Sequence, residues 1–170
     1  MLRISRLTDY ATVILANLAG QPGLVQTATA LAEQTRIAAP TVSKLLKQLQ
    51  KTNLVTSTRG LHGGYQLARP ATEISAADIL DALEGPVALT DCAAGQGHCS
   101  IEESCRVSRV WQRLNQAIRR SLSEVTLAQL AGLDASQVRL PALEREVKRP
   151  TPRRPVRCPS ANFRIDIRYE

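Results

Sequence analysis

The sequence predicts a mainly α-helical fold with a small β-hairpin: a winged helix-turn-helix followed by a long helix that joins two copies of the chain. Three observations predict it. Apolar residues recur at helical spacing up to residue 51, the period becomes that of strands between residues 55 and 68, and helical spacing returns after residue 107. The chain has 170 residues, of which 44% are hydrophobic. It can therefore bury a real core, but it is too short for a large multidomain enzyme.

The first two helices are predicted from apolar spacing and from their ends. The first carries four apolar residues at helical spacing and then meets a turn with glycine and proline: Leu7, Tyr10, Ile14 and Leu18, followed by Gly20 and Pro22. Thr27 is expected to cap a short second helix, which residues 36–38 end. A third helix begins at Pro40, a residue that the first turn of a helix tolerates.

The third helix has one apolar face and one basic, polar face. Val42, Leu45, Leu46 and Leu49 have the spacing of a buried face, and Thr41, Ser43, Lys44, Lys47, Gln48 and Lys51 lie largely opposite. In a winged helix-turn-helix this second helix of the pair enters the DNA major groove. We therefore expect Lys44 and Lys47 to bind phosphates or base edges, and Thr41 and Ser43 to face bases.

Two short predicted strands, 55–58 and 65–68, form the wing with the connection 59–64 between them, which contains three glycines. Arg59 suits a narrow minor groove, and Gly63 and Gly64 would let the backbone approach a phosphate backbone closely. His62 at the wing tip is either a further DNA contact or a polar turn residue.

The charge distribution supports double-stranded DNA as the partner. Residues 1–69 contain eight Lys and Arg and two acidic residues, whereas residues 70–105 contain seven acidic residues and no Lys or Arg. A solvated amphipathic helix is the alternative explanation for the lysines, but the wing and the basic balance favour DNA. Only five of the 170 residues are aromatic, which excludes a single-strand binder built on base stacking.

Beyond the wing, Ser75 is expected to cap a helix that ends before Gly85, and residues 86–105 are expected to form an ordered loop. A long helix follows from about Val107, with one further helical turn or two at 126–133. The long helix carries an apolar stripe flanked by arginines: Val110, Trp111, Leu114, Ile118, Leu122 and Val125. Few elements remain to cover this stripe, so a second copy of the helix is the natural partner, as in a homodimer.

These elements divide the chain into three parts. Residues 1–70 are the predicted DNA-binding domain, 71–133 hold the cysteine loop and the dimerisation helices, and 134–170 form a basic, proline- and arginine-rich tail that we predict to be mobile. The alternating end of this tail has strand period and would pair with a free sheet edge. Because the N-terminus has no secretory signal and no apolar run is long enough to span a membrane, we expect a cytoplasmic protein that does not enter membranes.

Three cysteines mark a metal site in the loop. Cys92, Cys99 and Cys105 are spaced C-x6-C-x5-C, whereas zinc sites usually use C-x2-C or C-x4-C pairs. Three cysteines in an open loop can instead reach three irons of a cuboidal iron-sulfur cluster. A mononuclear zinc site and three buried thiols without metal are the alternatives. The fourth ligand stays open among His98, Glu102, Glu103, Ser108 and a residue of a neighbouring chain.

An enzymatic role for these residues is disfavoured. Cys99 and His98 are adjacent and so seldom point at a common atom, and no orienting carboxylate or oxyanion motif is evident. Cys158, which lies far along the tail, is interpreted as a stray thiol. The sequence therefore predicts a binding protein and not an enzyme.

Four motifs in order resemble the iron-sulfur-sensing winged-helix repressors, the family of the isc and suf operon regulators and the nitric-oxide-sensing repressor. They are the opening 2–11, the stretch 40–47, the wing 59–65 and the three-cysteine loop. The resemblance covers about residues 1–133 and is closest to regulators of the SUF assembly system. It implies a homodimer that binds promoter DNA as a transcription regulator of iron-sulfur assembly genes, and we expect this regulator to be a repressor.

The resemblance also implies a [4Fe-4S] or [2Fe-2S] cluster on Cys92, Cys99 and Cys105. The isc regulator has a histidine ligand where this chain has Ser108. The nitric-oxide sensor instead completes a [4Fe-4S] cluster with an aspartate of the partner subunit, and the matching residue here is Asp9. The alternative for Asp9 is an acidic residue placed to suit the helix dipole. A zinc-stabilised winged-helix protein without redox sensing is the alternative function.

Overall fold

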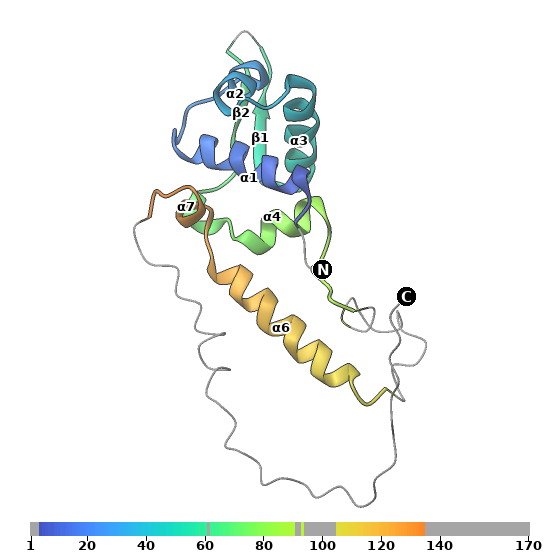
Figure 1. Ribbon diagram of the computed structural model, residues 1–170. Helices are drawn as coiled ribbons and strands as arrows, with labels where there is room; N and C mark the ends of the chain where they lie inside the picture. Colours follow the sequence, from blue (N-terminus) through green and yellow to red (C-terminus); the bar gives the residue numbers. More distant parts are fainter. Residues whose placement is uncertain (1–3, 61, 91–92, 94–104, 135–170) are drawn as a thin grey trace, which may run out of the picture.

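The computed structural model describes residues 4–60, 62–90, 93 and 105–134, and it contains a helical body with a β-hairpin at one end and a long helix at the other (Figure 1). The elements are α1 (Arg6–Ala19), α2 (Ala28–Thr35), α3 (Ala39–Lys51), β1 (Val55–Thr58), β2 (Gly64–Leu67), the 3-10 helix η1 (Ala71–Glu73), α4 (Ala76–Leu83), α6 (Ser108–Glu124) and α7 (Leu127–Leu130). The predicted fold class, mainly helical with one hairpin, is confirmed.

Side-chain caps fix where several helices begin. Ser5 accepts from the backbone N of Thr8 at the start of α1, and Thr27 accepts from Ala30 at the start of α2. Ser75 and Asp78 form a capping box at α4, as the sequence predicts for the Ser75 cap. The turn between α2 and α3 is closed by Arg36, whose φ of 57° lies in the left-handed region. Contacts within a few residues therefore determine where the helices of the helix-turn-helix begin and end.

The hairpin pairs β1 and β2 in antiparallel register, with Val55 opposite Leu67 and Thr58 opposite Gly64. Sequence spacing placed the second strand one residue later, at 65–68. The segment before α2 adds an isolated bridge to the outer side of β2. There Gln26 exchanges two backbone hydrogen bonds with Tyr65, of 2.9 and 2.7 Å. This bridge attaches the wing to the helical body.

The core lies between α1, α2, α3, α4 and α7. Its fully buried side chains come from α1, α2, α3, α4, α7 and the residue that ends η1: Ile14, Leu15, Leu31, Val42, Leu45, Leu46, Leu49, Ile74, Ile79 and Leu127. The short α7 belongs to this core because Leu127 N donates to Ile74 O at 2.7 Å, and Ser75 and Thr126 form a bridge beside it. The chain thus returns to the winged-helix body after α6.

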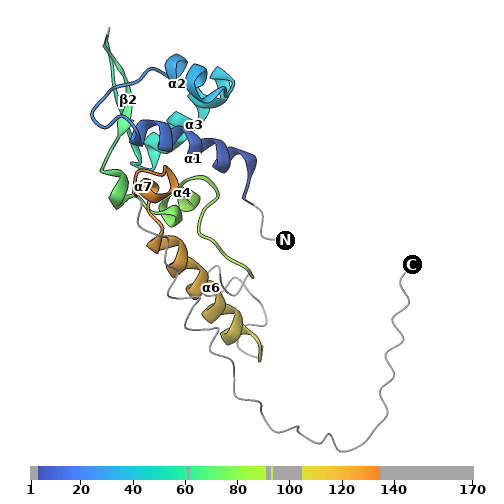
Figure 2. The same ribbon diagram turned by 60° about the vertical axis from the view of Figure 1, so that its left-hand side comes forward.

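Helix α6 extends away from that body (Figures 1 and 2). Its C-terminal half packs on α4, where Arg119 forms an ion pair with both carboxylate oxygens of Asp81. Within the described residues, no helix has the length and apolar character needed to cross a membrane. Most of the predicted cysteine loop and the tail 135–170 lie outside the described residues, so their expected order and mobility stay predictions.

Candidate functional site

Helix α3 presents the basic face that the sequence predicts. Val42, Leu45, Leu46 and Leu49 are buried, and Lys44 and Lys47 are exposed on the opposite side. Thr41 and Ser43 are half-buried near the start of the helix. No acidic residue lies in its first turn, so nothing there opposes the approach of a polyanion.

Gln48 differs from the sequence prediction. Its half-buried side chain donates from Nε2 to the carbonyls of Ala82 and Leu83 at 3.3 and 3.4 Å. These are the last two residues of α4, whose C-terminal carbonyls have no partner within their own helix. Gln48 therefore joins α3 to α4 instead of lying on the outward polar face.

The wing tip is exposed at Arg59 and His62. The two following glycines are half-buried, and the protein itself requires them. A Cβ on Gly63 would overlap the carbonyl O of Thr58, and one on Gly64 would lie 2.5 Å from that of Gln26. The structure thus gives these glycines an internal packing role, in addition to the predicted approach to DNA.

A hydrogen-bonded cluster at the start of α1 was not predicted. Glu84 Oε1 accepts from Ser5 N at 2.8 Å and from Thr8 Oγ1 at 2.5 Å, and Thr8 is only 2% exposed. These hydrogen bonds hold the pKa of the Glu84 carboxyl below its usual range, and the bond from Thr8 has the largest effect. Ser5 can be recognised as a helix cap from sequence, but its contact with Glu84, 79 positions later, has no local signal.

The same end of α4 carries a second charged contact. The Arg119 guanidinium of α6 binds the Asp81 carboxylate in two-pronged geometry, with 3.1 Å between Nη1 and Oδ1. This hydrogen bond raises the pKa of Arg119 above its usual value. Contacts from α1, α3 and α6 therefore all meet in the last turn of α4, just before the cysteine loop begins.

Of the predicted cluster ligands, the structure describes Cys105 and Asp9. Cys105 is half-buried three positions before Ser108, the first residue of α6, and its carbonyl accepts from Ser108 N at 3.4 Å. Cys92 and Cys99 lie outside the described residues, together with His98 and the two loop glutamates. Among the residues described, no three potential metal ligands lie together.

Ser108 and Asp9 have different surroundings. Ser108 is 4% exposed, and its Oγ lies 3.3 Å from Gln112 Nε2. Asp9 is exposed in the first turn of α1. Figures 1 and 2 both show that the N-terminal end of α6 lies farther from α1 than its C-terminal end. The start of α1, which carries Asp9, and the start of α6, which follows Cys105, therefore lie apart in one chain.

The outer face of α6 is the main apolar surface of the described chain. Val110 is 65% exposed, Trp111 40% and Leu114 44%, whereas the residues that α6 buries are the polar Ser108, Asn115 and Ser121. Asn115 Oδ1 accepts from Leu89 N at 3.2 Å, which fixes the polar side toward the body. The predicted stripe consequently faces solvent along the first half of the helix.

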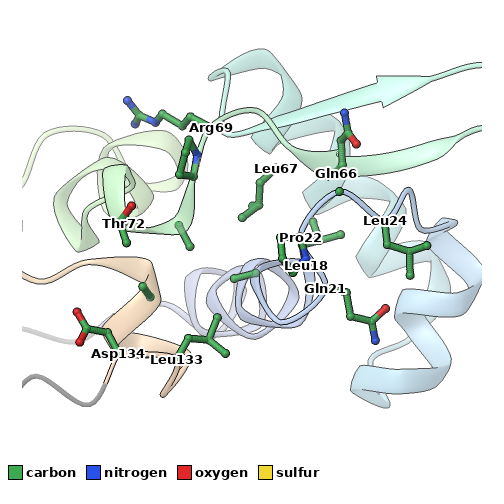
Figure 3. Close-up of a pocket in the computed structure, with 15 residues that line it drawn as sticks. Leu18, Gln21, Pro22, Leu24, Gln66, Leu67, Arg69, Thr72, Leu133 and Asp134 are labelled. Atoms are coloured by element: carbon green, nitrogen blue, oxygen red, sulfur yellow. The ribbon is translucent and has the colours of Figure 1, made fainter.

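A cavity of about 720 Å³ lies at the base of the wing (Figure 3). It is enclosed by the turn after α1, the end of β2, η1 and α7. Leu18, Leu67 and Leu133 contribute to its apolar walls. Leu133 and Asp134, the last described residues, form one rim, and Gln66 and Arg69 of the wing base lie across from them. Asp134, where the described residues end, therefore lies beside the base of the wing.

A family model described as an iron-dependent transcriptional regulator, the Rrf2 model, matches residues 4–132. The chain belongs to the Rrf2 family. It is 37% identical over 133 residues to a Mycobacterium tuberculosis protein named as an HTH-type transcriptional regulator, and the match covers 77% of this chain and 82% of that protein. This Rrf2 protein is a transcription regulator with a winged helix-turn-helix, and the prediction that it is not an enzyme is confirmed.

Solved structures of two further Rrf2 proteins are similar. The global cysteine regulator CymR of B. subtilis aligns with a TM-score of 0.62 and 27% identity, covering 79% of this chain and 99% of that one. IscR of T. potens aligns with a TM-score of 0.57 and 29% identity, covering 80% and 91%. The match ends near residue 132, so the tail lies beyond the family's shared region.

Proposed function

We propose that this Rrf2 protein is a homodimeric repressor of iron-sulfur assembly genes whose binding to promoter DNA follows the status of an iron-sulfur cluster. The observation that carries the proposal is the position of Cys105. The third cysteine of the predicted ligand set lies directly before α6, the helix with the exposed apolar face. A group bound at this thiolate would therefore act at the start of the dimerisation helix.

The donor set fits an iron-sulfur cluster better than the alternatives. Cys92, Cys99 and Cys105 would hold three irons as thiolates, and Asp9 would supply the fourth ligand. The bound cluster would supply sensitivity to oxidation, nitric oxide and iron supply. Because Asp9 is exposed in the first turn of α1, and the start of α6 lies apart from α1 in one chain, Asp9 would serve the cluster of the partner subunit. Ser108 is buried and already bonded, which disfavours it as the ligand.

The dimer would form through the α6 face. Three large apolar residues, Val110, Trp111 and Leu114, are exposed within the first two turns, and a helix of 17 residues spans about 25 Å. Soluble proteins rarely leave such a stripe uncovered, and a twofold pairing of α6 with its copy covers it on both chains. The Asp81–Arg119 ion pair would hold α6 at a fixed angle to the DNA-binding body.

The DNA contacts would come from α3 and the wing. Lys44 and Lys47 would bind phosphates or base edges, and Thr41 and Ser43 would reach bases from the start of the helix. Arg59 and His62 would enter the minor groove from the wing, with the backbone at Gly63 and Gly64 close to the phosphates. Gln48 lies between this face and α4 and would transmit a movement of α4 to α3.

Anaerobic purification tests the cluster. The full chain should show broad visible absorption with iron and acid-labile sulfide, and Cys92→Ala, Cys99→Ala and Cys105→Ala should each lose both. Cys158→Ala, a change in the fourth cysteine, should retain them and serves as the matched control. Colourless protein without iron or sulfide after reconstitution, and loop variants that bind promoter DNA as wild type does, would contradict the proposal.

A regulator without a cluster is the second candidate. Two observations favour it: the structural similarity to CymR, whose name identifies a cysteine regulator, and the absence of the isc-type histidine at Ser108. The cysteines would then bind zinc or remain free thiols. Metal analysis separates the two candidates, because zinc gives stoichiometric metal with no visible absorption.

A further inference from the structure

A groove of about 310 Å³ lies where α6 packs on α4. Its apolar walls come from α4, from the segment that follows α4, from α6 and from the residue before the cap of α1: Leu80, Val87, Ala88, Ile118, Leu122 and Ile4. Leu89 N donates to Asn115 Oδ1, which holds the segment after α4 against the middle of α6. Because Ile4 and Ala88 are both exposed, this α4–α6 groove is open to solvent.

The groove continues the apolar face of α6. Trp111, Leu114, Ile118 and Leu122 are spaced by three or four residues, so they share one side of the helix. Ile118 and Leu122 are half-buried in the groove, whereas Trp111 and Leu114 are exposed. Among the described residues, the chain therefore covers this face along the second half of α6 and leaves it uncovered along the first half.

A second copy covers the first half when two α6 helices pair antiparallel about their midpoint, residue 116. Val110 then lies opposite Leu122 of the partner subunit, and Leu114 lies opposite Ile118 of the partner subunit. A parallel pair would instead place the two exposed halves side by side and leave both grooves open. Antiparallel pairing fills both grooves by the same contact, as the twofold symmetry of a homodimer requires.

Charge favours the same direction of pairing. Arg106, Arg109 and Arg113 are exposed in the first half of α6 and just before it, and in the part of the chain that the structure describes none of them has a carboxylate partner. The exposed Glu84 lines the groove. Antiparallel pairing brings the arginines toward this carboxylate of the partner, whereas parallel pairing brings the two sets of arginines together.

We propose that the α4–α6 groove seats the N-terminal half of α6 from a second copy, with Trp111 of the partner subunit as its largest side chain. This inference rests on the proposed homodimer, and it assigns that dimer a direction and a second contact surface. Glu84 also accepts hydrogen bonds from Ser5 and Thr8. The pairing therefore brings the start of the partner's α6 next to the start of α1, whose first turn carries Asp9.

Photo-crosslinking of the full chain tests the direction. The photoreactive residue p-benzoylphenylalanine replaces Val110, which is 65% exposed, so the fold accommodates the larger side chain. Mixed dimers of isotope-labelled and unlabelled chains identify links between copies by mass spectrometry. We expect links to residues 76–88 or 118–124 of the partner. The same photoreactive residue at Gln116, an exposed position outside the apolar face, is the control and should give few links.

Blocking the groove tests the surface. Ala88→Arg adds a long cation at an exposed position of the groove, and it should raise the dimer Kd at least about tenfold, because the guanidinium displaces apolar contacts and lies beside the partner's arginines. Gln116→Arg adds the same charge to α6 outside the groove and should sediment as wild type. Sedimentation at several protein concentrations compares the variants, and circular dichroism checks that each is folded.

Two results would overturn this inference. One is a set of links from position 110 to any other part of the partner, such as residues 106–114 in a parallel pair. The other is an Ala88→Arg variant with the wild-type dimer Kd. Failure of the proposed homodimer looks different, since wild type itself would then sediment as a monomer and give no crosslinked pairs.

Discussion

Replacing Gly64 by Ala tests whether the wing is anchored as the structure indicates. A Cβ at this position would lie 2.5 Å from the carbonyl O of Gln26, 2.7 Å from its carbonyl C and 2.9 Å from Val25 Cγ1. Two of these atoms belong to the backbone and cannot rotate away. Relief of the clash requires a separation of nearly an ångström between β2 and the segment before α2, which breaks the bridge between Gln26 and Tyr65.

The cost follows from the two bridge bonds and the strain. Each bond, of 2.9 and 2.7 Å, contributes about 1 kcal/mol net, and the displaced backbone adds about 1 kcal/mol or more of strain. We therefore expect Gly64→Ala to lower the free energy of unfolding by about 3 kcal/mol. For a chain of this size, that corresponds to a Tm lower by about 6 to 12 °C.

Gly20→Ala is the matched control. Its Cβ would lie 3.5 Å from the nearest atom, an ordinary contact, and its φ of −67° suits any residue. Urea unfolding followed by circular dichroism should place this variant within about 0.5 kcal/mol of wild type, or slightly above it. Equal stabilities for the two variants would refute the close packing of the wing against Gln26.

Three further perturbations test other contacts. Glu84→Gln should make the free energy of unfolding depend less on pH in the acid range. The lowered pKa of the exposed Glu84 carboxyl stabilises the fold at pH values above its usual pKa, by up to about 1 kcal/mol, and this contribution is lost as the carboxyl is protonated on acidification. Urea unfolding at several pH values would contradict this if wild type and variant lost stability in parallel. Arg36→Gly should raise the free energy of unfolding by about 0.5 to 1 kcal/mol, because glycine adopts the φ of 57° without strain; a less stable variant in urea denaturation would contradict this. Asp81→Asn should cost about 1 kcal/mol, and a double-mutant cycle with Arg119→Gln should give a coupling energy that falls with salt; additivity would show that the ion pair contributes nothing.

Trp111→Glu tests the proposed dimer through α6. The charge falls at an exposed apolar position, so it should leave the monomer folded and shift sedimentation to the monomer. Gln116→Glu, on an exposed position of the same helix outside the apolar stripe, is the control and should sediment as wild type. Identical sedimentation of both variants as dimers would place the interface elsewhere.

The elements of the winged helix were predictable because their signals are local. Ser5, Thr27 and Ser75 each accept from an N–H group three residues later, and the apolar spacing of α3 directly gives its buried face. The sequence also indicated a glycine-rich wing, but it did not show why these positions require glycine. Gly64 is required by Gln26, a residue 38 positions earlier, and no local pattern predicts this approach.

Periodicity, caps and charge act within a few residues, and for this reason the sequence alone predicts a winged helix-turn-helix with a basic third helix, followed by a long amphipathic helix. How these elements contact one another was set by their packing. It turned Gln48 from the outward face to α4, joined Glu84 to the start of α1 and left the apolar face of α6 exposed. These contacts join residues that are distant in sequence, and only the packing of the whole core brings them together.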